Sequence, residues 1–208
     1  MSIQYAVNAE IFDIGQTLPI DSDNFLIDSN IWFWMTYSKS SYGNINFRQN
    51  IMNQYANYVG KVISCNAKIC CSGLSLSELS HIIEKTELNI HNSCNPPVIK
   101  TKEFRHNYPL KRSQVVKEIQ TAWSQVTNIA NSLSVNIDIS TSTNALNRLQ
   151  TEKIDGYDVF ILESMKGHNV VQVITDDGDF ATVSGIQVFT ANRNVLQAAK
   201  SQNMLKTR

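Results

Sequence analysis

The sequence predicts a three-layer α/β/α fold, in which helices cover both faces of a central, mainly parallel sheet. Short apolar runs such as Phe25–Ile27 and Val170–Ile174 alternate with longer stretches of helical spacing. Strands that are separated by helices pair in parallel. Acidic residues directly follow two of the apolar runs. Because open α/β folds bind their ligands at the carboxyl edge of the sheet, we expect a ligand site there.

Composition indicates a compact globular protein of one domain. The chain has 208 residues, of which 42% are hydrophobic and 17% are charged, and this excludes a disordered acidic or basic chain. Lys plus Arg and Asp plus Glu both number 18, so a nucleic-acid site would have to come from local charge patterning. The sequence contains no apolar run long enough for a transmembrane helix, and its start does not follow the pattern of a secretory signal. We expect a cytoplasmic protein without a membrane partner.

The first half of the chain contains two strand-like and three helix-like segments. Residues 1–22 are treated as an N-terminal extension of uncertain structure, and a single domain is expected over 23–208. Ser75 and Glu78 stand at the spacing of a capping box, which predicts that a helix begins there. The predicted elements are a strand over 25–27, helices over 31–37 and 45–63, a strand over 69–71 and a helix over 75–90.

The second half begins with a break in the pattern. Between His91 and Arg112, Pro96, Pro97 and Pro109 cannot continue a helix interior, and we expect an insertion over about 91–133. Residues 135–139 alternate between apolar and polar side chains, as a half-exposed strand does. The predicted elements are a helix over 113–133, a strand over 135–139, helices over 144–149 and 157–165, strands over 170–174 and 187–189, and a helix over 194–201.

Four acidic segments are candidates for a metal site. Asp28 and Asp177 follow apolar, strand-like runs, whereas Glu78 and Asp158 lie near the beginnings of helix-like segments. Convergent carboxylates repel one another unless a cation lies between them, and a hard divalent ion prefers oxygen ligands. The pattern therefore indicates metal-dependent chemistry on phosphodiesters.

The acidic segments also carry a resemblance to a known family. The chain reads Phe-Leu-Ile-Asp-Ser-Asn at 25–30, Leu-Ser-Glu-Leu at 76–79, Asp-Gly-Tyr-Asp-Val-Phe-Ile-Leu at 155–162 and Val-Ile-Thr-Asp-Asp-Gly-Asp-Phe at 173–180, followed by Gly-Ile-Gln-Val-Phe. In order and spacing these segments resemble the PIN domain, a family of Mg²⁺- or Mn²⁺-dependent ribonucleases that includes VapC-like toxins of toxin–antitoxin pairs. The resemblance covers Phe25 to about Thr190, except for a non-matching stretch from His91 to about Leu133.

The resemblance implies a role for each acid. The positions that match the family's catalytic acids are Asp28, Glu78, Asp158 and Asp177. The implied ligands of Mg²⁺ or Mn²⁺ are Asp28, Asp158, Asp177 and Asp179. Ser29 and Thr175 would hold the carboxylates by hydrogen bonds. The implied reaction is endonucleolytic hydrolysis of RNA to a 5′-phosphate and a 3′-hydroxyl, and the implied partners are RNA and an antitoxin-like inhibitor protein, with a homodimer left open.

Each acid also has a purely structural interpretation. Asp28 could cap the helix that follows it, and a capping box would explain Glu78. Asp158 could complement a helix dipole, and Asp155 competes with it for the same position in the family pattern. The acids around Gly178 suit an ordinary turn. The order of all four segments together favours the metal site.

A basic segment inside the expected insertion is a candidate RNA-binding surface. Its cations are Lys100, Lys102, Arg105, Lys111 and Arg112, and Phe104 and Tyr108 lie among them. Cations contact RNA phosphates, and an aromatic ring stacks on an unpaired base. A solvated, charge-rich loop is the alternative.

Three other interpretations remain open. A non-catalytic PIN-like module would bind RNA or scaffold a complex, and another metal-dependent nuclease would act on DNA. A zinc site would need Cys65, Cys70 or Cys71, His91 and Cys94. The cysteines lack paired Cys-x-x-Cys spacing, so reduced and mostly buried thiols are expected instead.

Overall fold

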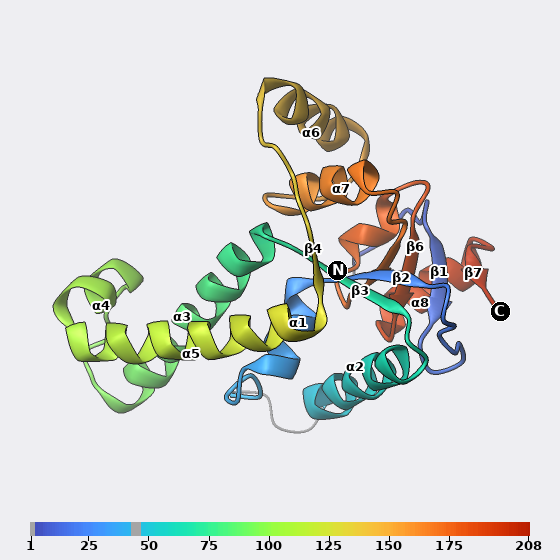
Figure 1. Cartoon of the computed structure of the whole chain (residues 1–208). Coiled ribbons are helices and arrows are strands. Elements are labelled where there is room, and N and C mark those ends of the chain that lie inside the picture. Colours follow the sequence, from blue (N-terminus) through green and yellow to red (C-terminus); the bar gives the residue numbers. More distant parts are fainter. Residues whose placement is uncertain (1–2, 43–46) are drawn as a thin grey trace.

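The computed structural model of the chain describes residues 3–42 and 47–208. Within these residues, seven strands form one parallel sheet in the order β4-β3-β2-β5-β6-β1-β7 (Figure 1). The strands are β1 (Glu10–Asp13), β2 (Asn24–Ile27), β3 (Lys68–Ser72), β4 (Asn131–Leu133), β5 (Gln172–Ile174), β6 (Gln187–Thr190) and β7 (Leu205–Lys206). The helices are α1 (Ser29–Thr36), α2 (Phe47–Ser64), α3 (Leu74–Cys94), α4 (Thr101–Asn107), α5 (Pro109–Ile129), α6 (Ile139–Thr151), α7 (Asp158–Gly167), α8 (Arg193–Ser201) and the short 3-10 helix η1 (Asp179–Thr182).

Buried side chains on both faces of the sheet place it between two helical layers. Along β2, Phe25 and Ile27 belong to a cluster with α1, α2, α3 and α5, whereas Leu26 belongs to a cluster with α7 and α8. In β6, Val188 and Phe189 are likewise divided between the two clusters. Neighbouring strand residues point to opposite faces, so a strand buried on both faces is a continuous apolar run. The predicted three-layer fold with a parallel sheet is confirmed.

The N-terminal segment over residues 1–22 contributes a strand to this sheet. β1 lies between β6 and β7, where Ile11 is opposite both Val188 and Leu205. Ile11 is fully buried in the core cluster of the α7 and α8 layer. The periodicity did not predict β1 or β7, which have four and two residues.

The predicted strand over 135–139 is wrong. The strand in this region is β4, which pairs with β3 at the edge of the sheet opposite β7. Asp138 instead caps α6, because its Oδ1 accepts a hydrogen bond from the Thr141 amide at 2.8 Å. Ile137 and Ile139 are 50% and 87% exposed, so the apolar alternation does not mark a buried face.

The region from 91 to 112, where the helical pattern breaks, is largely helical. α3 continues to Cys94, and α5 begins at Pro109 instead of residue 113. Proline is compatible with the first helical position, since the amide there has no partner within the helix. Phe104 of α4 is buried against Leu88 and Val115. Residues 84–119, here named the helical arm, extend away from the sheet (Figure 1).

The remaining predicted elements differ from the structure mainly at their ends. The predicted helix over 144–149 is longer and begins at Ile139, where α6 starts. Ile45, the predicted start of the second helix, lies outside the described residues. Among the residues that the structure describes, no helix has the length and apolar character needed to cross a membrane.

Candidate functional site

Asp28 lies at the junction of β2 and α1. Its backbone is extended and its Oδ1 accepts a hydrogen bond from the Ser29 amide at 2.6 Å, so it caps α1. Its other oxygen, Oδ2, accepts a hydrogen bond from Thr175 Oγ1 at 2.5 Å. Thr175 follows β5, the strand that pairs with β2. The cap and the contact with β5 fix the carboxylate at the carboxyl edge of the sheet.

Glu78 comes from the first turns of α3. The capping-box interpretation of this residue is wrong, since the helix begins at Leu74 with Gly73 at its cap, and no side chain bonds to the cap there. Ser75 is buried inside the helix. The Glu78 carboxylate instead accepts a hydrogen bond from Ser29 Oγ at 2.7 Å. Ser29 therefore contacts Glu78 directly and Asp28 through its amide.

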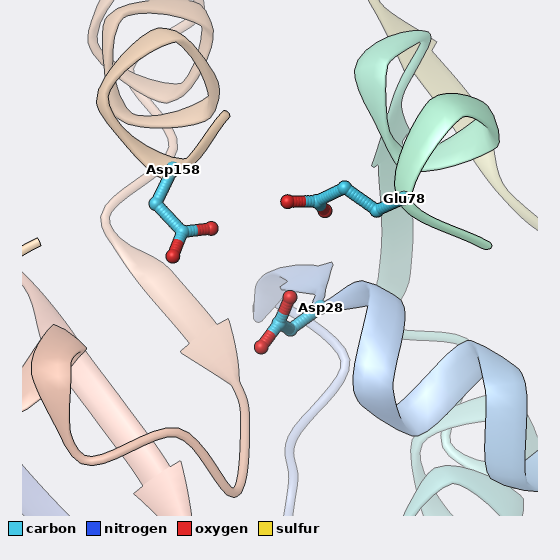
Figure 2. Close-up of side chains that lie close together, drawn as sticks. All are labelled: Asp28, Glu78 and Asp158. Atoms are coloured by element: carbon cyan, nitrogen blue, oxygen red, sulfur yellow. The ribbon is translucent and has the colours of Figure 1, made fainter. Parts of the chain in front are cut away.

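Asp158 approaches these two acids from the first turn of α7. Its side chain is buried, whereas the neighbouring Asp155 is exposed. Figure 2 shows Asp28, Glu78 and Asp158 pointing into one space. One carboxylate oxygen of each lies within 4.8 Å of those of the other two. Position alone therefore selects Asp158 over Asp155 as the third acid.

The arrangement of these three acids fits a hard divalent cation. Two oxygens on opposite sides of a Mg²⁺ ion are about 4.2 Å apart, since each Mg–O bond is about 2.1 Å long. All three oxygens lie within 4.8 Å of one another, so small side-chain shifts would bring them within bonding distance of one ion. Within residues 3–42 and 47–208, no other group of three His, Cys, Asp or Glu side chains has metal-binding spacing. The zinc alternative through the cysteines is therefore not supported.

Burial raises the pKa of all three carboxyl groups when no cation is bound. It raises the pKa of Asp158 to about 9, and the charges of Asp28 and Glu78 add to this effect. Burial also raises the pKa of Glu78 to about 7. For Asp28, burial raises the pKa to about 6 against the lowering effect of the Thr175 hydrogen bond. A cation that binds here must displace protons at neutral pH.

Asp177 and Asp179 lie on the loop after β5, next to this group but outside it. The Asp177 amide donates to Thr175 Oγ1 and the Asp179 amide donates to Asp177 Oδ1, both at 2.9 Å, so the loop is a turn closed by its own side chains. The charge of Asp177 nevertheless contributes to the raised pKa values of Asp28 and Asp158. The preceding Asp176 accepts a hydrogen bond from the Tyr55 hydroxyl at 2.9 Å.

A groove of about 580 Å³ begins beside the acids and reaches the helical arm. Its lining residues include Ser29, Ser77, Glu78, His81, Glu84, Arg105, Arg112 and Tyr157. Of the five predicted RNA-binding cations, the structure places Arg105 and Arg112 in this groove. Lys100 and Lys102 line a separate hollow with His106, and Lys111 is exposed.

Two contributors to the site were missed by sequence reasoning. The ring of Tyr5 lies against Gly178, and burial followed by the charges of Asp179 and Asp177 raises the pKa of the phenol. Nothing in the pattern of residues 1–22 indicates this contact. Glu84 is 4% exposed, although it is an acid in a helix. The only sequence feature that indicates burial of Glu84 is its position next to Ile83, which is itself buried, and this indication is weak.

Comparison with known proteins assigns the chain to a family. The sequence matched no curated protein. A family model described as the PIN domain matches residues 25–186, which is more than half of the chain and includes all the acids discussed above. PIN domains are generally metal-dependent nucleases, in agreement with three convergent carboxylates at the edge of a parallel sheet. The chain therefore belongs to the PIN domain family.

Proposed function

We propose that this protein is a Mg²⁺- or Mn²⁺-dependent endoribonuclease whose reaction takes place at Asp28, Glu78 and Asp158. The observation that carries this proposal is the convergence of the three carboxylates within 4.8 Å, beside a groove that also contains arginine side chains. Asp177 and Asp179 complete the acidic set from the loop after β5. The choice of RNA over DNA rests on the family resemblance, and a DNA-cleaving enzyme is the alternative that the substrate test below separates.

The chain's own residues prepare the site for this chemistry. When bound, a divalent ion polarises the scissile phosphate and lowers the pKa of the attacking water. Asp28 is held at both oxygens, by the Ser29 amide and by Thr175 Oγ1, so its orientation is set before any ligand arrives. Ser29 Oγ orients Glu78 in the same way. Asp158 would lose its proton on cation binding, because its pKa is raised by burial and by the neighbouring acids, whose charges a cation would offset.

Several finer predictions rest on the resemblance alone. These are a toxin role, an antitoxin-like inhibitor protein, a homodimer and a cytoplasmic location. The nuclease activity does not depend on any of them. The alternative from a different functional class is a non-catalytic RNA-binding module. Such a module would bind metal and RNA without cleaving the strand.

The first test removes one ligand charge without changing the shape of the side chain. Asp28→Asn and Asp177→Asn are each expected to lower Mn²⁺-dependent cleavage of single-stranded RNA by more than about 100-fold, since loss of groups that only support metal ligands already costs 10–100-fold. Asp155→Asn is the matched control, because Asp155 is exposed and belongs neither to the group of three nor to the acidic loop after β5. Cleavage is measured on labelled RNA and on DNA of the same sequence. A folded Asp28→Asn protein with wild-type activity would exclude the proposed site.

The second test concerns the metal independently of cleavage. At a hundredfold excess over Kd, Mn²⁺ should stabilise the wild type by about 2.7 kcal/mol, which corresponds to a rise in Tm of roughly 5–10 °C for a chain of this size. The Asp28→Asn/Asp158→Asn variant should lose most of that rise in a thermal melt. An equal rise in both proteins would place the metal elsewhere.

A further inference from the structure

We propose that Arg105 and Arg112, held together by Glu84, form a phosphate clamp that holds a single unpaired nucleic-acid strand in the groove beside the acids. The proposal rests on the proposed nuclease function and adds to it a binding position and a substrate class. It also distinguishes among the five basic residues of the helical arm, because only two of them lie in the groove.

The clamp is built on a buried acid. The Glu84 side chain is 5% exposed, whereas those of Arg105 and Arg112 are 45% and 39% exposed. Arg105 donates from Nε to Glu84 Oε1 at 2.8 Å and from Nη2 to Oε2. Arg112 donates from Nη1 to Oε1 at 2.9 Å. Each arginine is thus anchored at one side of its guanidinium while the side chain remains accessible in the groove.

Charge favours an anion at this position. Two guanidinium groups share one carboxylate, so the cluster carries one excess positive charge. Its hydrogen bond with Arg105 lowers the pKa of Glu84, and the carboxylate is therefore ionised. A guanidinium has five N–H donors, and Glu84 takes two from Arg105 and one from Arg112. The remaining donors and the excess charge suit a phosphate, which guanidinium groups bind in a fork geometry.

The clamp lies close enough to the three acids for one nucleic-acid strand to contact both. Glu78 and Glu84 are six residues apart on α3, which corresponds to about 9 Å along the helix axis. A nucleic-acid strand advances about 3.4 Å per nucleotide when its bases are stacked and more when it is extended. A phosphate at the arginines therefore belongs to a nucleotide within about three of the one that is cleaved. Binding energy at the clamp would then position the scissile bond.

The remaining lining of the groove favours an unpaired strand. Its volume of about 580 Å³ is in the range of sites for single small molecules and is large enough for a nucleotide. His81 and Tyr157 both line it, and both are exposed. Aromatic rings stack on bases only where the bases are not paired. The groove therefore favours single-stranded segments through stacking on these exposed rings.

Binding is tested in the full-length Asp28→Asn protein, which separates affinity from cleavage. The Glu84→Gln/Arg105→Gln/Arg112→Gln variant removes all three charges and leaves no buried acid unpaired. We expect its Kd for a labelled single-stranded RNA to rise at least about tenfold, as for other hydrogen bonds to charged groups. The slope of log Kd against log salt should become flatter by about 1.4, or about 0.7 per lost phosphate contact. Fluorescence anisotropy at several salt concentrations measures both quantities.

Two further variants make the result specific. Lys100→Gln/Lys102→Gln removes two charges from the separate hollow of the same arm, and its Kd should stay within about twofold of that of the Asp28→Asn parent. Arg112→Gln alone leaves Glu84 paired with Arg105, and its Kd should rise by part of the increase expected for the triple variant. This variant decides the matter if the triple variant does not fold. A duplex of the same sequence should compete poorly.

The clamp is excluded if the triple variant keeps the Kd and salt slope of the parent, or if Arg112→Gln binds RNA as tightly as the parent. It is also excluded if the lysine pair loses as much affinity as the arginines, or if the duplex competes as well as the single strand. These outcomes are independent of the nuclease test. Loss of affinity in the triple variant combined with an inactive wild type would support the clamp and contradict the catalytic role.

Discussion

At the scale of single residues, the site depends on hydroxyl groups that connect acids from different strands. Thr175 is fully buried, donates to Asp28 Oδ2 and accepts from the Asp177 amide. Its hydroxyl therefore joins the acid after β2 to the acidic loop after β5. The sequence pattern was sufficient to single out Thr175, because it stands between an apolar strand and the acids of a recognisable motif. Glu84 has no such context, since an acid on a helix is normally solvent-exposed.

Thr175→Val removes this hydroxyl while it preserves the shape of the side chain. Asp28 then loses a hydrogen bond that lowers its pKa, and the Asp177 amide loses its acceptor. We expect Mn²⁺ affinity or RNA cleavage to fall by about 10–100-fold, as measured by metal titration and by single-turnover cleavage. Thr175→Ser keeps the hydroxyl and should retain most of both. If the valine and serine variants behave alike, the hydrogen bond is not needed for function.

At the scale of elements, segments with strong helical periodicity and short apolar runs were predictable, whereas α4 and β4 were not. α2 and α8 correspond to predicted helices within a few residues, because their apolar spacing extends over two turns or more. α4 was missed, since prolines on both sides hide a helix of seven residues. β4 is three residues long and was displaced by the nearby apolar alternation at 135–139. Its place depends on pairing with β3, which the local sequence does not encode.

The contact between the N-terminal segment and the acidic loop is also an element-scale feature. Gly178 has an ordinary φ of −74°, so a close approach, not its backbone conformation, explains the glycine. A Cβ atom at this position would lie 2.3 Å from the ring of Tyr5. The loop that carries Asp177 and Asp179 is thus in direct contact with a segment from the beginning of the chain.

Gly178→Ala is expected to destabilise the protein by about 1 kcal/mol. This is the lower end of the range for substitutions that overpack a site, because the Tyr5 ring is partly exposed and can move. The corresponding fall in Tm is roughly 2–4 °C. In a Tyr5→Ala background the same substitution should cost almost nothing, which a double-mutant cycle of thermal melts would show. A penalty of equal size in both backgrounds would mean that the ring and the loop are not in contact.

At the scale of the whole molecule, the buried acids make stability depend on pH. The folded pKa values of Asp28, Glu78 and Asp158 are about 6, 7 and 9, against ordinary values of 3.8, 4.5 and 3.8. The folded protein therefore binds more protons than the unfolded chain between about pH 4 and pH 9. The contribution of these groups to the free energy of unfolding is greatest near pH 4 and falls as the pH rises from about 4 to 9.

This dependence predicts a result for the metal-free protein. Urea denaturation in the presence of a chelator should show a free energy of unfolding that decreases from about pH 5 to pH 9. Asp158→Asn should flatten the decrease more than Asp28→Asn, because Asp158 has the larger rise in pKa. Saturating Mn²⁺ should reverse the trend in the wild type, since the cation competes with protons. Stability that rises with pH in the metal-free wild type would contradict the burial of these acids.

The strand order also determines when the site is completed during synthesis of the chain. β2 lies beside β5, so the hydrogen bond between Asp28 and Thr175 joins residues 147 positions apart. β6, the next strand in the sheet, pairs with β1 from the opposite end of the sequence. A ribosome that has translated Asp28 has therefore not yet produced β5 and Thr175, which hold its carboxylate in place. The pairings of β5 with β2 and of β6 with β1 join segments that are distant in sequence, and such pairings form slowly. The chain gains its full set of acids only when most of it has been translated.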